Sequence, residues 1–187
     1  MIVGDNMASL DSVKNILESN NDITREIKDD LFELIVIFNH EFPNVGLDNL
    51  ESHLKTLKIK KSSKFFSGDI STYDYRHNIL YFNQSCMSDD YDFRHILMFE
   101  LLNIISCNKV QTGFNSDDKF EALNIGYTEI LANYLVGNNG EKLIYPNEAI
   151  MANMIGVVVG NENLFESYFN NDPRILLNAL AKAGVEL

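Results

Sequence analysis

The sequence has little of what defines several common protein classes. Its 187 residues include no tryptophan, three prolines and two cysteines, Cys86 and Cys107. These two cysteines flank the most apolar stretch of the chain without any metal-type spacing, so they predict neither a cysteine zinc site nor a disulfide scaffold. Free buried thiols are what we expect of them in an intracellular protein.

Positive charge and long apolar runs are also scarce. Fifteen basic residues stand against 27 acidic ones, and the resulting net charge of −12 disfavours nucleic-acid binding. The longest apolar runs, Leu31–Phe38 and Ala149–Gly160, are too short to cross a bilayer. The N-terminus lacks the basic start and apolar segment of a signal peptide. We therefore predict an acidic cytoplasmic protein that binds neither nucleic acid nor membrane.

What is present indicates one globular domain over residues 1–187, because 45% of the residues are hydrophobic, with 12 Phe and 8 Tyr. Residues 1–56 have the 3.6-residue period of helices, and residues 119–187 are helical throughout. Residues 57–118 combine strand-like alternation, at about 57–83, with a central helix. Arg76-His77 is predicted to be the turn of a hairpin. The fold class expected is α+β and mostly helical, with a small antiparallel or mixed sheet before the central helix.

Local signals predict several helix ends. Ser9 is expected to cap the first helix, and Asp48-x-x-Glu51 has the form of a capping box for the third. Acidic or hydroxyl side chains at 88–90 are expected to cap the central helix. A helix from Pro146 to just before Gly160 is predicted to bury one apolar stripe, which comprises Ile150, Met154, Ile155, Val158 and Val159.

The central helix, Asp92–Ser106, contains the segment Met98-Phe99-Glu100-Leu101-Leu102-Asn103. In the H-E-x-x-H arrangement of zinc peptidases, two histidines four residues apart bind one metal ion from one helical face. The glutamate beside the first histidine is the general base. Glu100 occupies the general-base position here, whereas Phe99 and Asn103 stand where the histidines would be.

A second segment, Leu123–Glu129, reads L-N-I-G-Y-T-E. It is similar to the L-N-E-G-x-T-E pattern that carries the third zinc ligand in gluzincin, or thermolysin-like, metallopeptidases. Ile125 replaces the ligand glutamate, and Glu129 matches the acid that supports a zinc-bound histidine from outside the metal shell. Over about residues 57–180 the chain therefore resembles a gluzincin without its three ligands. The resemblance implies a zincin-like fold.

The same resemblance implies a protein that has lost the activity of its family. Zinc sites need about three good ligands, so we expect no zinc, no other cofactor and no catalysis, with Glu100 a vestigial base. Phe99 and Ile125 would fill the volume of the metal and its water. The hypothesis is a binding or regulatory module that uses the former cleft or the surface around it for an unidentified protein or peptide. Possible cleft residues are His95, Asn124 and Tyr127.

Three alternatives remain open. The chain could be a hydrolase with altered chemistry or a metal site rebuilt from His95, Glu100 and Glu129. It could be a helical interaction protein unrelated to peptidases, in which case no sheet is expected before residue 90. It could also keep the fold and regulate an active relative by occupying that relative's partner.

Overall fold

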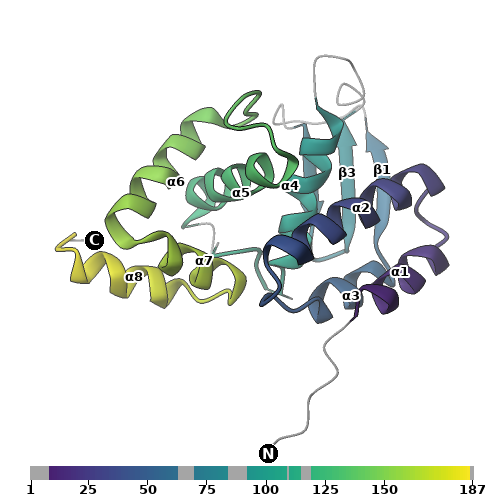
Figure 1. Cartoon of the computed structure of the whole chain (residues 1–187), viewed down its shortest axis with the longest axis horizontal. Helices are drawn as coiled ribbons and strands as arrows, with labels where there is room; N and C mark the ends of the chain where they lie inside the picture. The colour runs from purple at the N-terminus through teal and green to yellow at the C-terminus, as the bar shows by residue number, and fades with distance from the viewer. Residues whose placement is uncertain (1–8, 63–69, 84–91, 109, 115–118, 186–187) are drawn as a thin grey trace, which may run out of the picture. The chain divides into compact units, whose positions relative to one another are not determined.

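The computed structural model describes residues 9–62, 70–83, 92–108, 110–114 and 119–185. These residues form eight helices and one small three-stranded sheet, as the α+β and mostly helical prediction required (Figure 1). None of the helices in these ranges is both long and apolar enough to span a bilayer. The chain divides into two compact units, Met1–Ile105 (unit 1) and Ser106–Leu187 (unit 2).

Unit 1 begins with three helices: α1 (Leu10–Ser19), α2 (Arg25–Glu41) and α3 (Asp48–Leu54). The Ser9 side chain accepts a hydrogen bond from the backbone N–H of Ser12, which confirms the predicted cap of α1. The capping-box prediction for α3 is wrong. Asp48 is the first residue inside the helix, the N-cap position belongs to Leu47, and no side chain caps this end. A carboxylate within the first turn still faces the positive end of the helix dipole.

The sheet of unit 1 contains β1 (Lys58–Ser62), β2 (Ser71–Asp74) and β3 (Ile79–Asn83), in the order β1-β3-β2. Figure 1 labels the neighbouring strands β1 and β3. The predicted hairpin is confirmed by the antiparallel pairing of β2 with β3. Asp74 accepts hydrogen bonds from the backbone N–H groups of Arg76 and His77, which holds the turn. Because β1 pairs with β3 in parallel, the sheet is mixed.

Helix α4 (Phe93–Ile105) is the centre of unit 1 and contacts α2, α3 and β2. Ten of its thirteen residues are buried, because it is apolar on nearly every side. The predicted caps at 88–90 lie outside the described residues. At the start of the described part of α4, the Asp92 carboxylate accepts hydrogen bonds from the backbone N–H groups of Arg94 and His95, at 3.1 and 3.3 Å.

Unit 2 is helical in all its described elements: α5 (Glu121–Val136), α6 (Pro146–Val159), α7 (Asn161–Phe169) and α8 (Pro173–Lys182) (Figure 1). Helices α5 and α6 approach closely at Gly126, where an added Cβ atom would overlap the backbone carbonyl of Glu148. Gly137 ends α5 in the left-handed conformation, with φ of 78°, as a C-cap glycine does.

The apolar stripe predicted for α6 is mostly wrong. Ile150, Met154 and Val158 are 59%, 65% and 52% exposed, although Val159 is buried as expected. The other buried residues of α6 are the small Ala149, Ala152 and Gly156. Since Gly126 brings the α5 backbone within contact of α6, small side chains fill the interface. The larger aliphatic residues of α6 consequently lie on its opposite face.

Candidate functional site

The first half of the predicted motif lies on α4, in unit 1. Glu100 is only 1% exposed, so its carboxylate is not a solvated one on the helix surface. Its Oε2 atom accepts a hydrogen bond of 3.1 Å from the amide Nδ2 of Asn103, three residues further along the helix. Phe99, which precedes Glu100 in the sequence, is also buried.

The Glu100–Asn103 hydrogen bond defines what Asn103 offers chemically. A metal ligand presents a lone pair to the cation, as a neutral imidazole does. Asn103 instead turns an N–H group toward the carboxylate. Asn103, at the position predicted for a lost ligand, thus satisfies one oxygen of Glu100, the predicted vestigial base, as a buried carboxylate requires.

His95 lies one turn before Phe99 on the same helix. Its side chain is 1% exposed, so the ring belongs to the interior of the protein. The sequence interpretation made His95 a possible cleft residue. A buried ring of this kind reaches solvent only if the surrounding residues move.

The second half of the motif lies on α5, in unit 2. Glu129 is fully buried, and its Oε1 atom accepts a hydrogen bond of 2.7 Å from the backbone N–H of Ile144. One turn later, Asn133 accepts a hydrogen bond from the N–H of Gly140 and donates one to the carbonyl of Glu141, at 2.6 and 2.9 Å. These two side chains hold the connection between α5 and α6 against α5.

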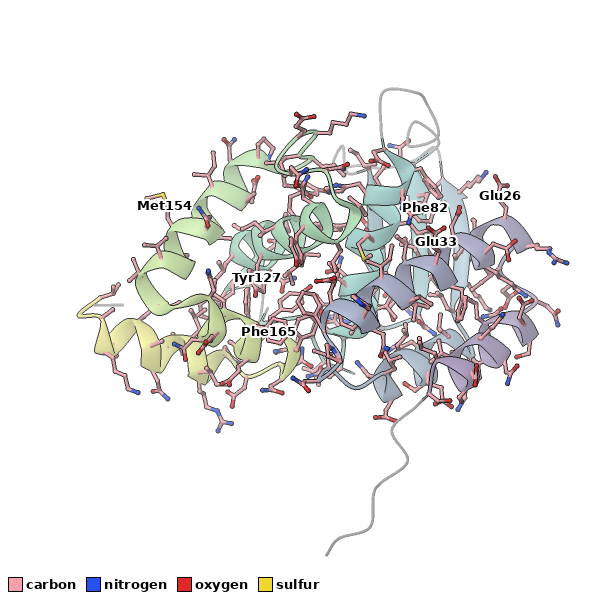
Figure 2. The ribbon with its side chains drawn as sticks, in the orientation of Figure 1. Glu26, Glu33, Phe82, Tyr127, Met154 and Phe165 are labelled. Atoms are coloured by element: carbon pink, nitrogen blue, oxygen red, sulfur yellow. The ribbon has the colours of Figure 1, made fainter. Side chains whose placement is uncertain are left out.

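An aromatic cluster packs around Tyr127, which Figure 2 labels on α5. Its ring centroid is 5.3 Å from that of Tyr168 and 5.8 Å from that of Phe114. Thr128 donates its hydroxyl proton to the carbonyl of Asn124 at 2.8 Å. Because that hydroxyl has one proton, Tyr168 must donate in the 2.7 Å hydrogen bond between the two hydroxyl groups.

Sequence reasoning found Asn124 and Tyr127 but missed Tyr168, Thr128 and Phe114. No periodicity could have found Tyr168, because 40 positions separate it from Thr128. Gly113 has a φ of 53°, and a Cβ atom there would overlap Oδ1 of Asn124, so this position needs glycine for both reasons.

The burial of Tyr127 predicts a pH dependence of stability. Loss of hydration raises the pKa of the Tyr127 hydroxyl above its usual range, and the neighbouring Tyr168 adds to the shift. Above a pH of about 10, Tyr127 ionises in the unfolded chain and stays protonated in the folded one. Stability contributed by this group is therefore present below that pH and falls by about 1.4 kcal/mol per pH unit above it.

We expect Tyr127→Phe to remove that part of the alkaline decline. The measurement is the urea midpoint of unfolding between pH 8 and about 12, compared with the unsubstituted chain. Tyr134→Phe is the matched control, because Tyr134 is 59% exposed on the same helix. Equal alkaline slopes for the unsubstituted chain and Tyr127→Phe would contradict the buried-hydroxyl explanation.

The predicted site residues fall into two groups that are described within their own units. Unit 1 holds His95, Phe99, Glu100 and Asn103, and unit 2 holds Asn124, Ile125, Tyr127 and Glu129. Within either unit, the part of the chain that is described contains no group of three or more His, Cys, Asp or Glu side chains arranged to hold a metal ion. Of the two cysteines, Cys107 is buried and donates its thiol proton to the carbonyl of Asn108, and Cys86 lies outside the described residues.

Comparisons of the chain with models of protein families, with curated proteins and with solved structures found no match.

Proposed function

We propose that this chain is a zincin-like relative of the metallopeptidases that does not hydrolyse peptides and acts by binding a protein or peptide partner. The observation that carries the proposal is the hydrogen bond from Asn103 to Glu100. In an active site of this type, the glutamate keeps its lone pairs for a metal-bound water. Here the Glu100 carboxylate is buried and already accepts a hydrogen bond from Asn103, which stands at the position of a lost ligand.

The order of the elements supports the same proposal. A small mixed sheet, β1 to β3, precedes α4, and a second long helix follows in the other unit. The alternative of an unrelated helical interaction protein predicts no sheet before residue 90. The resemblance to the gluzincins predicts one.

The burial of the acidic residues favours a structural role for what remains of the motif. Glu129 uses one oxygen to hold the backbone at Ile144, and Glu100 uses one to hold Asn103. Buried carboxylates with such partners are retained because removing them leaves donors unsatisfied. Their presence therefore requires no catalysis. A hydrolase with a rebuilt metal site stays the second candidate, and its first ligand would be His95.

Metal content tests the proposal directly. We expect the purified, untagged chain, after zinc addition and dialysis, to retain less than about a tenth of an equivalent, since too few ligands remain at the motif positions. Mass spectrometry measures the number of zinc ions per chain. Incubation with a mixed peptide library measures any peptide hydrolysis. Stoichiometric zinc would contradict the proposal, and its loss in His95→Ala would identify the rebuilt site.

The binding half of the proposal needs a separate experiment. The chain serves as bait in an extract of its native host, and each captured protein is purified and titrated against the chain alone. A protein or peptide that binds in isolation is the expected result. Retention of a small molecule as the sole specific ligand would contradict a protein-binding role.

A further inference from the structure

The outer face of α6 is apolar and unusually exposed. Ile150, Met154, Val157 and Val158 form this face, called the α6 crest below, and Val157 is 80% exposed. Figure 2 shows Met154 projecting away from the body of unit 2. Four large aliphatic side chains on a single helical face form a contiguous patch, which monomeric proteins rarely leave in water.

The spacing within the α6 crest is that of a helix-packing seam. Ile150, Met154 and Val157 follow one another at intervals of four and three residues, as alternating core positions of a coiled coil do. The opposite face of α6 is already packed inside unit 2 through its small residues. The crest is therefore a second packing face and not a part of the core that failed to be covered.

Two hollows of unit 2 flank the crest, so that α6 forms a ridge between them. A hollow of about 380 Å³ lies on one side, lined by Ile130, Tyr134, Leu143 and Ile150 among others. On the other side, a hollow of about 480 Å³ is lined by Val158, Ile175, Ala179 and Lys182 among others. A ridge beside a groove complements itself under a twofold rotation, because each copy's ridge enters the other's groove.

The distribution of charge favours a second copy of the chain at this face over one at the rest of the surface. Each copy of the chain carries a net charge of −12, so two copies repel each other over most of their surface. No charged residue occurs from Ala149 to Gly160, and the lining of the two hollows adds one charged side chain, Lys182. This face is thus a place where two acidic copies approach without like charges meeting.

We propose that the α6 crest is the interface of a homodimer, with the α6 helices of two copies packed antiparallel about a twofold axis near Met154. Met154 of one copy then contacts Met154 of the second copy, and Ile150 of each copy lies against Val158 of the other. The flexible thioether of methionine suits a position that faces itself. This inference does not depend on the function proposed above.

The size of the face sets the expected affinity. A helix of 14 residues is about 21 Å long. One helix of that length does not supply the roughly 800 Å² per partner of a standard interface, so the rims of both hollows must also be buried. We expect a dimer with a Kd on the order of 10 µM.

The test is the oligomeric state of the full chain, measured by analytical ultracentrifugation over a range of concentrations. Met154→Glu places two like charges at the twofold axis, and we expect it to weaken the dimer by at least about a hundredfold. Because Met154 is 65% exposed, this variant should fold normally, which far-ultraviolet circular dichroism checks. Ala122→Glu adds the same charge at an exposed position of α5 and should leave the dimer unchanged.

A second measurement locates the interface independently of the affinity. Met154→Cys is expected to form a covalent dimer on mild oxidation, while Ala122→Cys and the unsubstituted chain, treated in parallel, are not. A monomeric chain at every concentration would overturn the proposal, and so would a dimer that Met154→Glu leaves intact. Binding of an amphipathic peptide to a monomeric chain through the α6 crest would overturn it in favour of another occupant.

Discussion

Placing two imidazoles on one face of α4, by Phe99→His and Asn103→His together, is expected to yield a chain that binds zinc. Positions 99 and 103 are four residues apart within α4, so the two imidazoles leave one helical face and can reach one ion. We expect binding at least about tenfold tighter than that of the unsubstituted chain, because two imidazoles hold the ion together. The site lies within unit 1 and tests the first half of the predicted motif.

A variant with one new imidazole is the matched control. Asn103→His alone leaves Phe99 between the new imidazole and His95, so no second imidazole stands four residues away. Isothermal titration calorimetry with zinc compares the single and the double variant. Equal zinc affinities for the two variants would show that the imidazoles at 99 and 103 do not bind one ion.

Folding of the double variant must be measured alongside its metal affinity. Phe99 is buried, and a histidine there without metal leaves polar nitrogens short of partners. Unfolding with and without zinc separates the two effects, since a ligand that binds the folded state alone raises its stability. Zinc-dependent stabilisation confined to the double variant is the expected outcome.

Gly126→Ala is expected to lower the free energy of unfolding by about 2–3 kcal/mol, although alanine is the better helix former. On an exposed helix surface the same change gains about 1 kcal/mol. Here the new methyl group would overlap the carbonyl of Glu148 and approach the backbone nitrogen of Ala149 to 3.0 Å. Backbone atoms cannot swing aside as a flexible side chain does, so α5 and α6 must separate.

Urea unfolding followed by circular dichroism measures the effect of this substitution, and a probe within unit 2 is preferable because the chain has two compact units. Ala122→Gly is the control for helix propensity, since residue 122 is exposed on the same helix. We expect it to lose about 1 kcal/mol. A stability gain in Gly126→Ala would show that α5 and α6 are not in backbone contact.

Local chemistry explains why parts of the fold were predictable. The Ser9 cap and the hairpin each depend on a few neighbouring residues whose backbone preferences are strong. The central position of α4 was predictable because its segment is apolar on almost every side, which only a surrounded helix tolerates.

Other features depend on which segments meet. No local sequence signal makes α3 begin at Asp48, with Leu47 as the N-cap residue, when Asp48 itself is the usual type of cap. For α6, the period of the apolar residues indicates a stripe but does not say which of two apolar faces turns inward. Gly126 decides that question from another helix, because its missing side chain admits the small face of α6 and leaves Met154 outside.

The candidate site divides in the same way. By itself, the sequence determined which side-chain atoms Phe99, Asn103 and Ile125 offer at the positions where the resemblance predicts ligands, because residue identity sets which atoms have lone pairs. Only the tertiary structure decided that Asn103 donates to a buried Glu100, and that Tyr168 donates to Thr128 across 40 positions of chain. Hydrogen bonds of this kind depend on burial, which removes water as a partner, and burial is a property of the folded chain.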